Sequence, residues 1–163
     1  MKNSIKTFVF STVLILFVVF SCSEDDSERV TEGGPFEISE LAGNWEASFA
    51  FFVRVSDEMS VDIVASGGSL SLTVQSNGRC TFTIDPVDRE AYTVSGEMFW
   101  ELYEGDYFFA IEYDDYPGDW ASYGATLTDT TFNMFGGPDS GEYDFNNDGT
   151  TESARLSFEF IRD

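Results

Sequence analysis

Oxygen-bearing side chains recur at alternate positions near the end of the chain, and a glycine, Gly149, lies among them. Calcium loops use short side chains at this spacing because their oxygens converge on one ion, while a glycine permits the sharp turn. The pattern therefore indicates a possible calcium site. Its candidate ligands are Asp144, Asn146, Asp148, Thr150 and Glu152.

The same segment departs from an EF-hand at its end. Arg155 stands where an EF-hand loop carries its bidentate glutamate, and the flanking residues alternate like strands. An EF-hand is therefore excluded. Two interpretations stay open: a calcium loop of another kind, and an acidic hairpin turn, for which Asp, Asn and Gly are favoured in any case.

Aromatic and acidic side chains are interleaved over residues 100–123. Alternation along strands buries only about half of such rings, which leaves others for a rim or a surface. Exposed rings beside carboxylates suit sugars, whose C–H faces stack on the rings while their hydroxyls donate to the acids. Trp100, Tyr116 and Trp120 are therefore candidate glycan-binding residues. The alternative is that these aromatics only cover a barrel mouth or an edge strand.

The composition excludes several chemistries. The chain has no histidine and only two lysines, Lys2 and Lys6, both near its start, so a serine or cysteine nucleophile lacks a base. With 30 Asp and Glu, chance carboxylate pairs are inevitable, and pairing alone does not indicate a glycosidase. We expect no enzymatic activity. The formal net charge of −22 also argues against nucleic acid as a partner.

The beginning of the chain has the parts of an export signal. Lys2 and Lys6 precede an apolar run over residues 8–20, which is too short to span a bilayer. Residues 18–22 resemble a bacterial lipoprotein signal of the Bacteroidetes type, in which the cysteine becomes the lipidated first residue. The resemblance implies a signal peptide over residues 1–21 and a membrane anchor on Cys22.

An acidic run follows this cysteine. Residues 23–28 resemble the export signal that takes such lipoproteins to the outer face of the outer membrane, which implies an envelope location with surface display. Residues 22–35 lack periodic apolar positions and predict an acidic flexible tether. The folded domain is expected over residues 36–163. With Cys22 lipidated, Cys80 has no partner and no disulfide is expected.

From Trp45 onward the dominant period of the hydrophobic pattern is two, which is typical of strands with one buried face. The first long alternation comprises Trp45, Ala47, Phe49, Phe51, Val53 and Val55. Further alternating segments follow to the end of the chain, and only residues 36–41 fit a helical turn. The pattern predicts an all-β fold, an antiparallel up-and-down barrel of about 8–10 strands with a short N-terminal helical turn. A β-sandwich is the alternative.

The head of the first long strand resembles a known family. Gly43-Asn44-Trp45 is similar to the Gly-x-Trp signature of lipocalins and their bacterial lipocalin-like relatives. Those folds also place a basic residue near the end of the last strand, packed across the tryptophan, and Arg162 has the parity that this requires. Such a cation over an indole contributes about 0.5–2 kcal/mol. Gly43, Trp45 and Arg162 are therefore expected to close one end of the barrel.

The resemblance implies a cavity for a small hydrophobic ligand. Its expected lining is Phe49, Phe51, Val53, Leu72, Phe82 and Met98. The alternative is that these large side chains fill the barrel. We expect a lipid-anchored extracytoplasmic binding protein that requires no cofactor, with calcium as an optional ion. The alternatives are a cell-surface glycan-binding or protein-interaction module, and a structural envelope lipoprotein with a filled barrel.

Overall fold

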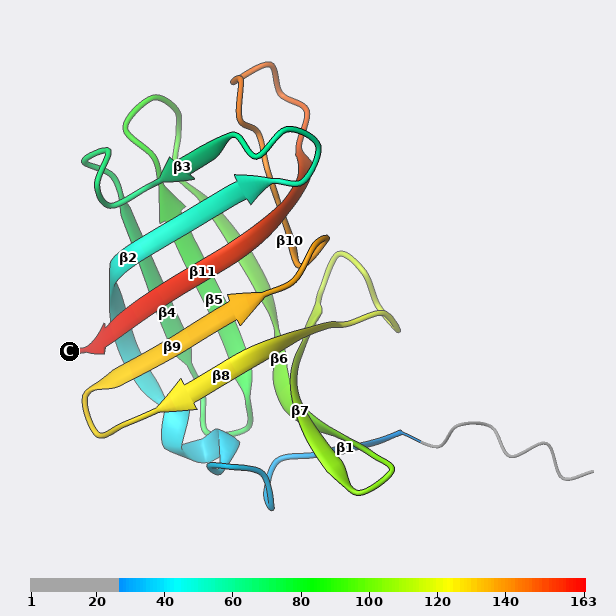
Figure 1. Ribbon diagram of the computed structural model, residues 1–163. Coiled ribbons are helices and arrows are strands. Elements are labelled where there is room, and N and C mark those ends of the chain that lie inside the picture. The colour runs from blue at the N-terminus through cyan, green and yellow to red at the C-terminus, as the bar shows by residue number, and fades with distance from the viewer. Residues whose placement is uncertain (1–26) are drawn as a thin grey trace, which may run out of the picture.

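The computed structural model describes residues 27–163, and this part of the chain is almost entirely β-structure (Figure 1). The all-β prediction and the short helical turn are confirmed, whereas residues 1–26, including Cys22, lie outside the described residues. The elements are β1 (Glu28–Val30), η1 (a 3₁₀ turn, Ile38–Leu41), β2 (Gly43–Arg54), β3 (Ser60–Asp62), β4 (Ser69–Val74), β5 (Arg79–Asp85), β6 (Tyr92–Tyr103), β7 (Asp106–Tyr113), β8 (Ala121–Leu127), β9 (Thr131–Gly136), β10 (Gly141–Tyr143) and β11 (Glu152–Arg162).

Eight strands form a closed antiparallel barrel. Around the barrel the order is β2, β4, β5, β6, β7, β8, β9 and β11, and β11 then pairs with β2. The last strand therefore runs beside the first in the opposite direction, with Arg162 opposite Trp45. This is the up-and-down barrel that the alternation predicts, and the sandwich alternative is wrong.

Three short strands extend the long ones. β3 pairs with the second half of β2, β10 with the start of β11, and β1 with the second half of β6. The N–H of Ile38 also donates to the carbonyl of Thr31 at 2.9 Å. The ordered domain thus begins before Phe36, and the expected flexible tether is wrong for Glu28–Val30, because this segment is hydrogen-bonded to a barrel strand.

A β-bulge at Ser48 changes which face of β2 is buried. Glu159 of β11 lies opposite Phe49, whereas the next residue of β11 lies opposite Ala47, so Ser48 is the extra residue. The Ser48 hydroxyl donates to the Glu159 carboxylate at 2.7 Å. Past the bulge the side chains that face inward are those of Ala50 and Phe52, which are almost fully buried.

The bulge overturns part of the predicted cavity lining. Phe49 and Phe51 stack on each other outside the barrel, with ring centroids 5.5 Å apart, and Val53 shares their side of the strand. The expectation that Phe49, Phe51 and Val53 line the interior is therefore wrong, because one additional residue reverses the alternation.

One end of the barrel is closed by aromatic packing. The Trp45 indole is fully buried and donates to the carbonyl of Leu41 at 2.8 Å, which ties it to η1. The Arg162 guanidinium lies 4.1 Å from the centroid of the Trp45 ring and donates to the carbonyls of Ala42 and Glu40. Further rings that fill this end are those of Phe36, Trp100, Phe109, Phe132 and Phe160.

Gly43 contributes to the same closure. It begins β2 with a φ of +139°, a backbone conformation that side-chain-bearing residues rarely adopt. A Cβ at this position would lie 3.4 Å from Nη1 of Arg162. The expected structural group of Gly43, Trp45 and Arg162 therefore does assemble at one end of the barrel.

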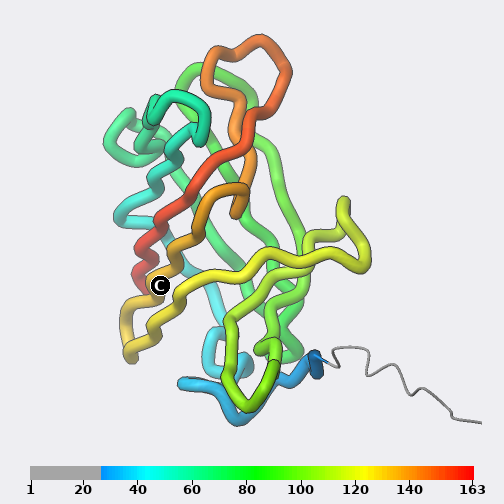
Figure 2. The backbone as a smooth tube through the Cα atoms, turned by 45° about the vertical axis from the view of Figure 1, so that its right-hand side comes forward, coloured from blue at the N-terminus to red at the C-terminus, as the bar shows by residue number. Residues whose placement is uncertain are grey.

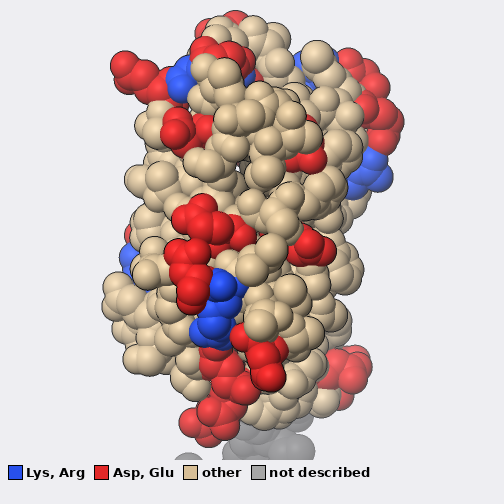
Figure 3. All heavy atoms as spheres, turned by 90° about the vertical axis from the view of Figure 1, so that its left-hand side faces the viewer, with Lys and Arg blue, Asp and Glu red and all other residues tan. Residues whose placement is uncertain are grey.

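The charges are distributed unevenly. Carboxylates gather in small groups beside the few arginines on the face drawn in Figure 3. Five of the six arginines form ion pairs with Asp or Glu, and the sixth, Arg162, lies over Trp45. Most carboxylates of the domain consequently have no cationic partner.

Over residues 27–163, no helix has the length and apolar character needed to cross a membrane.

Candidate functional site

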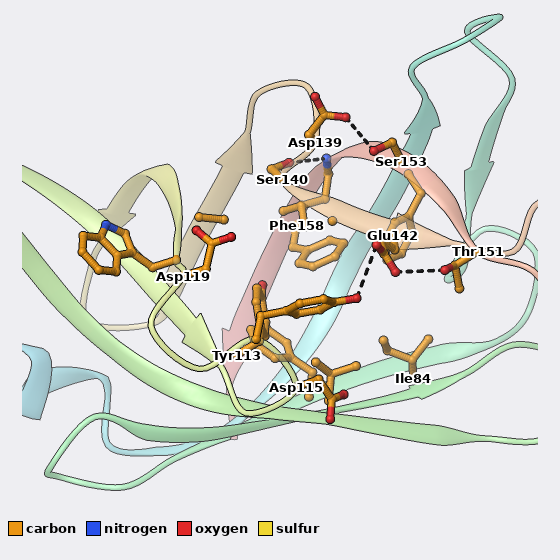
Figure 4. Close-up of a pocket in the computed structure, with 18 of the residues that line it drawn as sticks. Ile84, Tyr113, Asp115, Asp119, Asp139, Ser140, Glu142, Thr151, Ser153 and Phe158 are labelled. Carbon is orange, nitrogen blue, oxygen red and sulfur yellow. Dashed lines mark hydrogen bonds between the residues drawn. The ribbon is translucent and has the colours of Figure 1, made fainter.

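A pocket of about 490 Å³ opens into the barrel at the end away from η1. Its volume falls in the range of small-molecule sites, roughly 300–1,000 Å³. The barrel is therefore neither wholly open nor wholly filled. The lining comprises Phe52, Phe82, Ile84, Tyr92, Val94, Tyr113, Asp115, Tyr116, Asp119, Trp120, Ala121, Asp139, Ser140, Gly141, Glu142, Thr151, Ser153, Leu156 and Phe158 (Figure 4).

The floor of the pocket is apolar because strand alternation points these side chains inward. Phe82 and Ile84 lie two residues apart on β5, Leu156 and Phe158 two apart on β11, and Val94 faces them from β6. All but Val94 are buried, and Val94 is half-buried. An apolar molecule in contact with this floor would be removed from water, which is favourable.

The rim of the pocket carries four carboxylates, Asp115, Asp119, Asp139 and Glu142. They come from three segments of the chain: Asp115 and Asp119 belong to the loop between β7 and β8, Asp139 to the connection between β9 and β10, and Glu142 to β10 (Figure 4). Among the described lining residues there is no Lys, Arg or His. The pocket thus combines an apolar floor with a negatively charged rim.

Two tyrosines form a hydrogen-bonded chain at the inner wall. The hydroxyl oxygens of Tyr113 and Tyr123 lie 2.7 Å apart, and Tyr123 donates to the carbonyl of Ser140 at 2.6 Å. Because Tyr123 uses its only hydroxyl proton on Ser140, the proton between the rings belongs to Tyr113. Burial raises the pKa of both phenols, so both stay neutral near pH 7. Tyr113 therefore has only lone pairs for a molecule in the pocket.

The loop over residues 114–120 forms one wall and stands out from the barrel in Figure 2. Arg29 of β1 fixes its base, because its guanidinium pairs with Glu112 and lies 4.6 Å from the ring centroids of both Phe99 and Trp120. The second oxygen of Glu112 accepts the N–H of Gly118 at 2.5 Å. The hydrogen bond from Gly118 and the cation of Arg29 hold the pKa of Glu112 below its ordinary value.

The predicted cavity residues divide between the two halves of the barrel. Phe82 lines the pocket, whereas Leu72 and Met98 are fully buried within the packed core. The alternation of the sequence predicts that these side chains point inward. It does not predict which of the inward side chains border empty space, because the empty space depends on the size of their neighbours across the barrel.

The predicted rim aromatics also divide. Trp100 is buried, and its indole donates to the carbonyl of Phe36 at 2.9 Å, so the prediction of a rim position is wrong for this residue. Trp120 borders the pocket, but its indole donates to Glu101 and packs on Phe99. Tyr116 is exposed and lies at the rim. The three rings therefore do not form one sugar-binding platform.

The predicted calcium ligands lie in a loop whose carboxylates already accept hydrogen bonds from the protein. Asp144 accepts the N–H groups of Asp148 and Gly149 at 3.2 and 2.8 Å. Glu152 accepts from the Arg54 guanidinium at 2.9 Å and from the Phe145 N–H at 3.1 Å. Burial raises the pKa of Asp144, but its backbone hydrogen bonds outweigh that effect and lower it overall.

The remaining candidate ligands share this pattern. Asn146 accepts from the N–H of Asp148, and Asp148 accepts from the N–H of Thr150 at 2.9 Å. These are the contacts of an acidic turn, the second interpretation of this segment. Within the described part of the chain, no group of three or more His, Cys, Asp or Glu side chains is arranged to hold a metal ion. These contacts favour the acidic turn over a calcium loop, and a thermal melt with calcium distinguishes the two interpretations.

Apart from Tyr116 and Trp120, sequence reasoning did not single out the polar residues that border the pocket. Tyr113, Asp139 and Glu142 come from β7, from the connection after β9 and from β10, and no local motif joins them. The one usable signal is the parity of Tyr113, which has the same inward orientation as Ile111 and Phe109, two and four residues before it.

Comparison of the chain with protein-family models, with curated proteins and with solved structures gives no significant match.

Proposed function

We propose that this chain is a lipid-anchored, extracytoplasmic binding protein of the lipocalin-like kind, which holds a small hydrophobic ligand without catalysing a reaction. The observation that carries the proposal is the pocket of about 490 Å³ in a barrel whose other end is closed by packed aromatic rings. A rigid closed end gives the pocket a fixed floor, which reduces the ordering cost of binding.

The proposal of a non-catalytic role is supported by the residue types at the pocket. Its lining has hydroxyls and carboxylates, but the whole chain has no imidazole. The only serines that border the pocket are Ser140 and Ser153. Ser153 donates to the Asp139 carboxylate, which is a much weaker base than the imidazole that usually activates a serine, and the hydroxyl of Ser140 accepts the N–H of Leu156.

Binding in the pocket is tested with Nile red, a neutral hydrophobic dye whose fluorescence rises in apolar surroundings. Val94→Trp places a large ring in the pocket and is expected to abolish the fluorescence increase. Thr93→Trp is the matched control, because the adjacent side chain on β6 is exposed and points outward. Equal dye binding by both variants and the unsubstituted chain, with unchanged circular dichroism, would overturn the proposal.

The proposed anchor and the outer-membrane location rest on the sequence, through the basic start, the apolar run and Cys22. Cells grown with radiolabelled palmitate are expected to label the full chain and to leave the Cys22→Ser chain unlabelled. Fractionation is expected to place the labelled protein in the outer membrane. Label in neither chain would remove the anchor while leaving the pocket proposal standing.

A further inference from the structure

Four of the six hydroxyl groups that line the pocket donate their protons to the protein itself, and the exceptions are Tyr92 and Ser140. Thr151 donates to the Glu142 carboxylate at 2.9 Å, and the hydroxyl of Tyr116 donates to the same carboxylate at 3.4 Å. Ser153 donates to Asp139. Tyr113 donates to Tyr123, as argued above. The polar side-chain atoms left for a ligand are therefore mainly acceptors.

The rim carboxylates also lack cationic partners. The ion pairs of the described residues use other acids, and none includes Asp115, Asp119, Asp139 or Glu142. Each of the six arginines is engaged elsewhere, five in these ion pairs and Arg162 on Trp45. An anionic or acceptor-rich ligand would meet uncompensated negative charge at the mouth, which disfavours it.

Aromatic rings complete the environment. Tyr92, Tyr113 and Tyr116 border the pocket together with Phe82 and Phe158. The face of such a ring attracts a cation, and cages of aromatic rings and carboxylates suit alkylammonium groups. The net charge of the chain adds a long-range field that concentrates cations near the mouth.

From these observations we infer that the ligand is an organic cation, a molecule with an ammonium group and an apolar body. The body occupies the floor formed by Phe82, Leu156 and Phe158, and the ammonium group lies at the rim near Asp119 and Glu142. The inference rests on the proposed function, since it names the class of ligand that the same pocket takes.

Three probes with one shared apolar body test the sign of the charge. They are 2-(1-naphthyl)ethylamine, which is cationic at pH 7, 2-(1-naphthyl)ethanol, which is neutral, and 1-naphthylacetate, which is anionic. Isothermal titration calorimetry of the full chain is expected to give about tenfold tighter binding for the amine than for the alcohol, with the acetate weakest. The advantage of the amine is expected to shrink as the salt concentration rises.

A pair of substitutions assigns the effect to the rim. In Asp119→Asn combined with Glu142→Gln, the amine is expected to lose its advantage while the alcohol binds as before. The control combines Asp106→Asn at the start of β7 with Asp129→Asn in the turn between β8 and β9, which removes two exposed acids that do not line the pocket and is expected to keep the advantage of the amine.

Equal affinity for all three probes would overturn the inference and leave the hydrophobic pocket in place. An advantage for the amine that survives in the rim variant would overturn the assignment of the ammonium group to this rim. Binding of no probe, together with no uptake of Nile red, would overturn both this inference and the proposed function.

Discussion

The guanidinium of Arg29 lies 4.6 Å from the centroid of the Trp120 ring, so the first strand of the domain holds the loop that walls the pocket. Arg29 belongs to β1, which pairs with β6, and Trp120 ends the loop over residues 114–120. A segment far away in the sequence is thus coupled to the geometry of the pocket.

Replacing Arg29 is expected to loosen this loop. Arg29→Ala removes a cation from between two rings and an ion pair with Glu112, for a total of about 1 kcal/mol at this partly exposed site. Limited proteolysis is expected to cut the loop faster, and tryptophan emission is expected to shift to longer wavelength. Arg155→Ala, which removes only a surface ion pair with Glu58, is the control. Identical digestion of both variants would contradict the role of Arg29.

The carboxylate of Glu112 gives the stability of the domain a defined pH dependence. The N–H of Gly118 and the guanidinium of Arg29 lower its pKa in the folded state from the ordinary 4.5. A carboxylate whose pKa is lowered by folding stabilises the folded state at pH values above its ordinary pKa. This stabilisation is lost as the pH falls through the pKa of the folded state. The melting temperature of the unsubstituted chain is therefore expected to exceed that of Glu112→Gln at pH 7, with the gap closing as the pH falls below 4.5. A gap that stays constant over this range would contradict the assignment.

The closed end of the barrel depends on Arg162. Arg162→Ala removes the cation over Trp45 and two hydrogen bonds to backbone carbonyls, which is expected to cost about 2–3 kcal/mol of unfolding free energy. Arg162→Lys keeps the charge but not the forked donor geometry and is expected to fall between. Urea unfolding measures both. A loss no larger than that of Arg155→Ala would show that the closure does not need this residue.

The barrel could be predicted from the sequence because hydrophobic alternation recurs in strand after strand, so one local irregularity does not hide the pattern. Arg162 and Trp45 meet as parity required, since both lie on strands whose pairing at that end is regular. The prediction failed at Phe49 and Phe51, because a single bulge residue, Ser48, reverses the alternation without any signature of its own. The pocket was beyond reach for a related reason: its rim comes from segments that only the folded topology brings together.

Two truncations test the reversed alternation. Phe52→Ala removes a buried ring and is expected to cost about 3–5 kcal/mol. Phe51→Ala removes a ring from the outer face of the same strand and is expected to cost less than about 1 kcal/mol. Chemical denaturation compares the two chains. A larger loss of unfolding free energy for Phe51→Ala than for Phe52→Ala would mean that Phe51 points inward and would contradict the bulge.

The acidic turn over residues 144–152 is expected to respond little to calcium. Its carboxylates would have to give up the N–H groups of Gly149 and Phe145 and the guanidinium of Arg54 to coordinate an ion. A thermal melt with and without millimolar calcium is expected to show no specific shift, with magnesium as the control. A rise in melting temperature for calcium alone would establish the predicted site.

The central claim is that the pocket at the open end of the barrel holds a small amphipathic cation. A crystal of the chain soaked with a brominated 2-(1-naphthyl)ethylamine locates the ring directly, through the anomalous scattering of bromine. The expected position is inside the pocket against Leu156 and Phe158, with the amine toward Glu142. Bromine found only on the outer surface, beside Phe108 or Phe135, would contradict the claim.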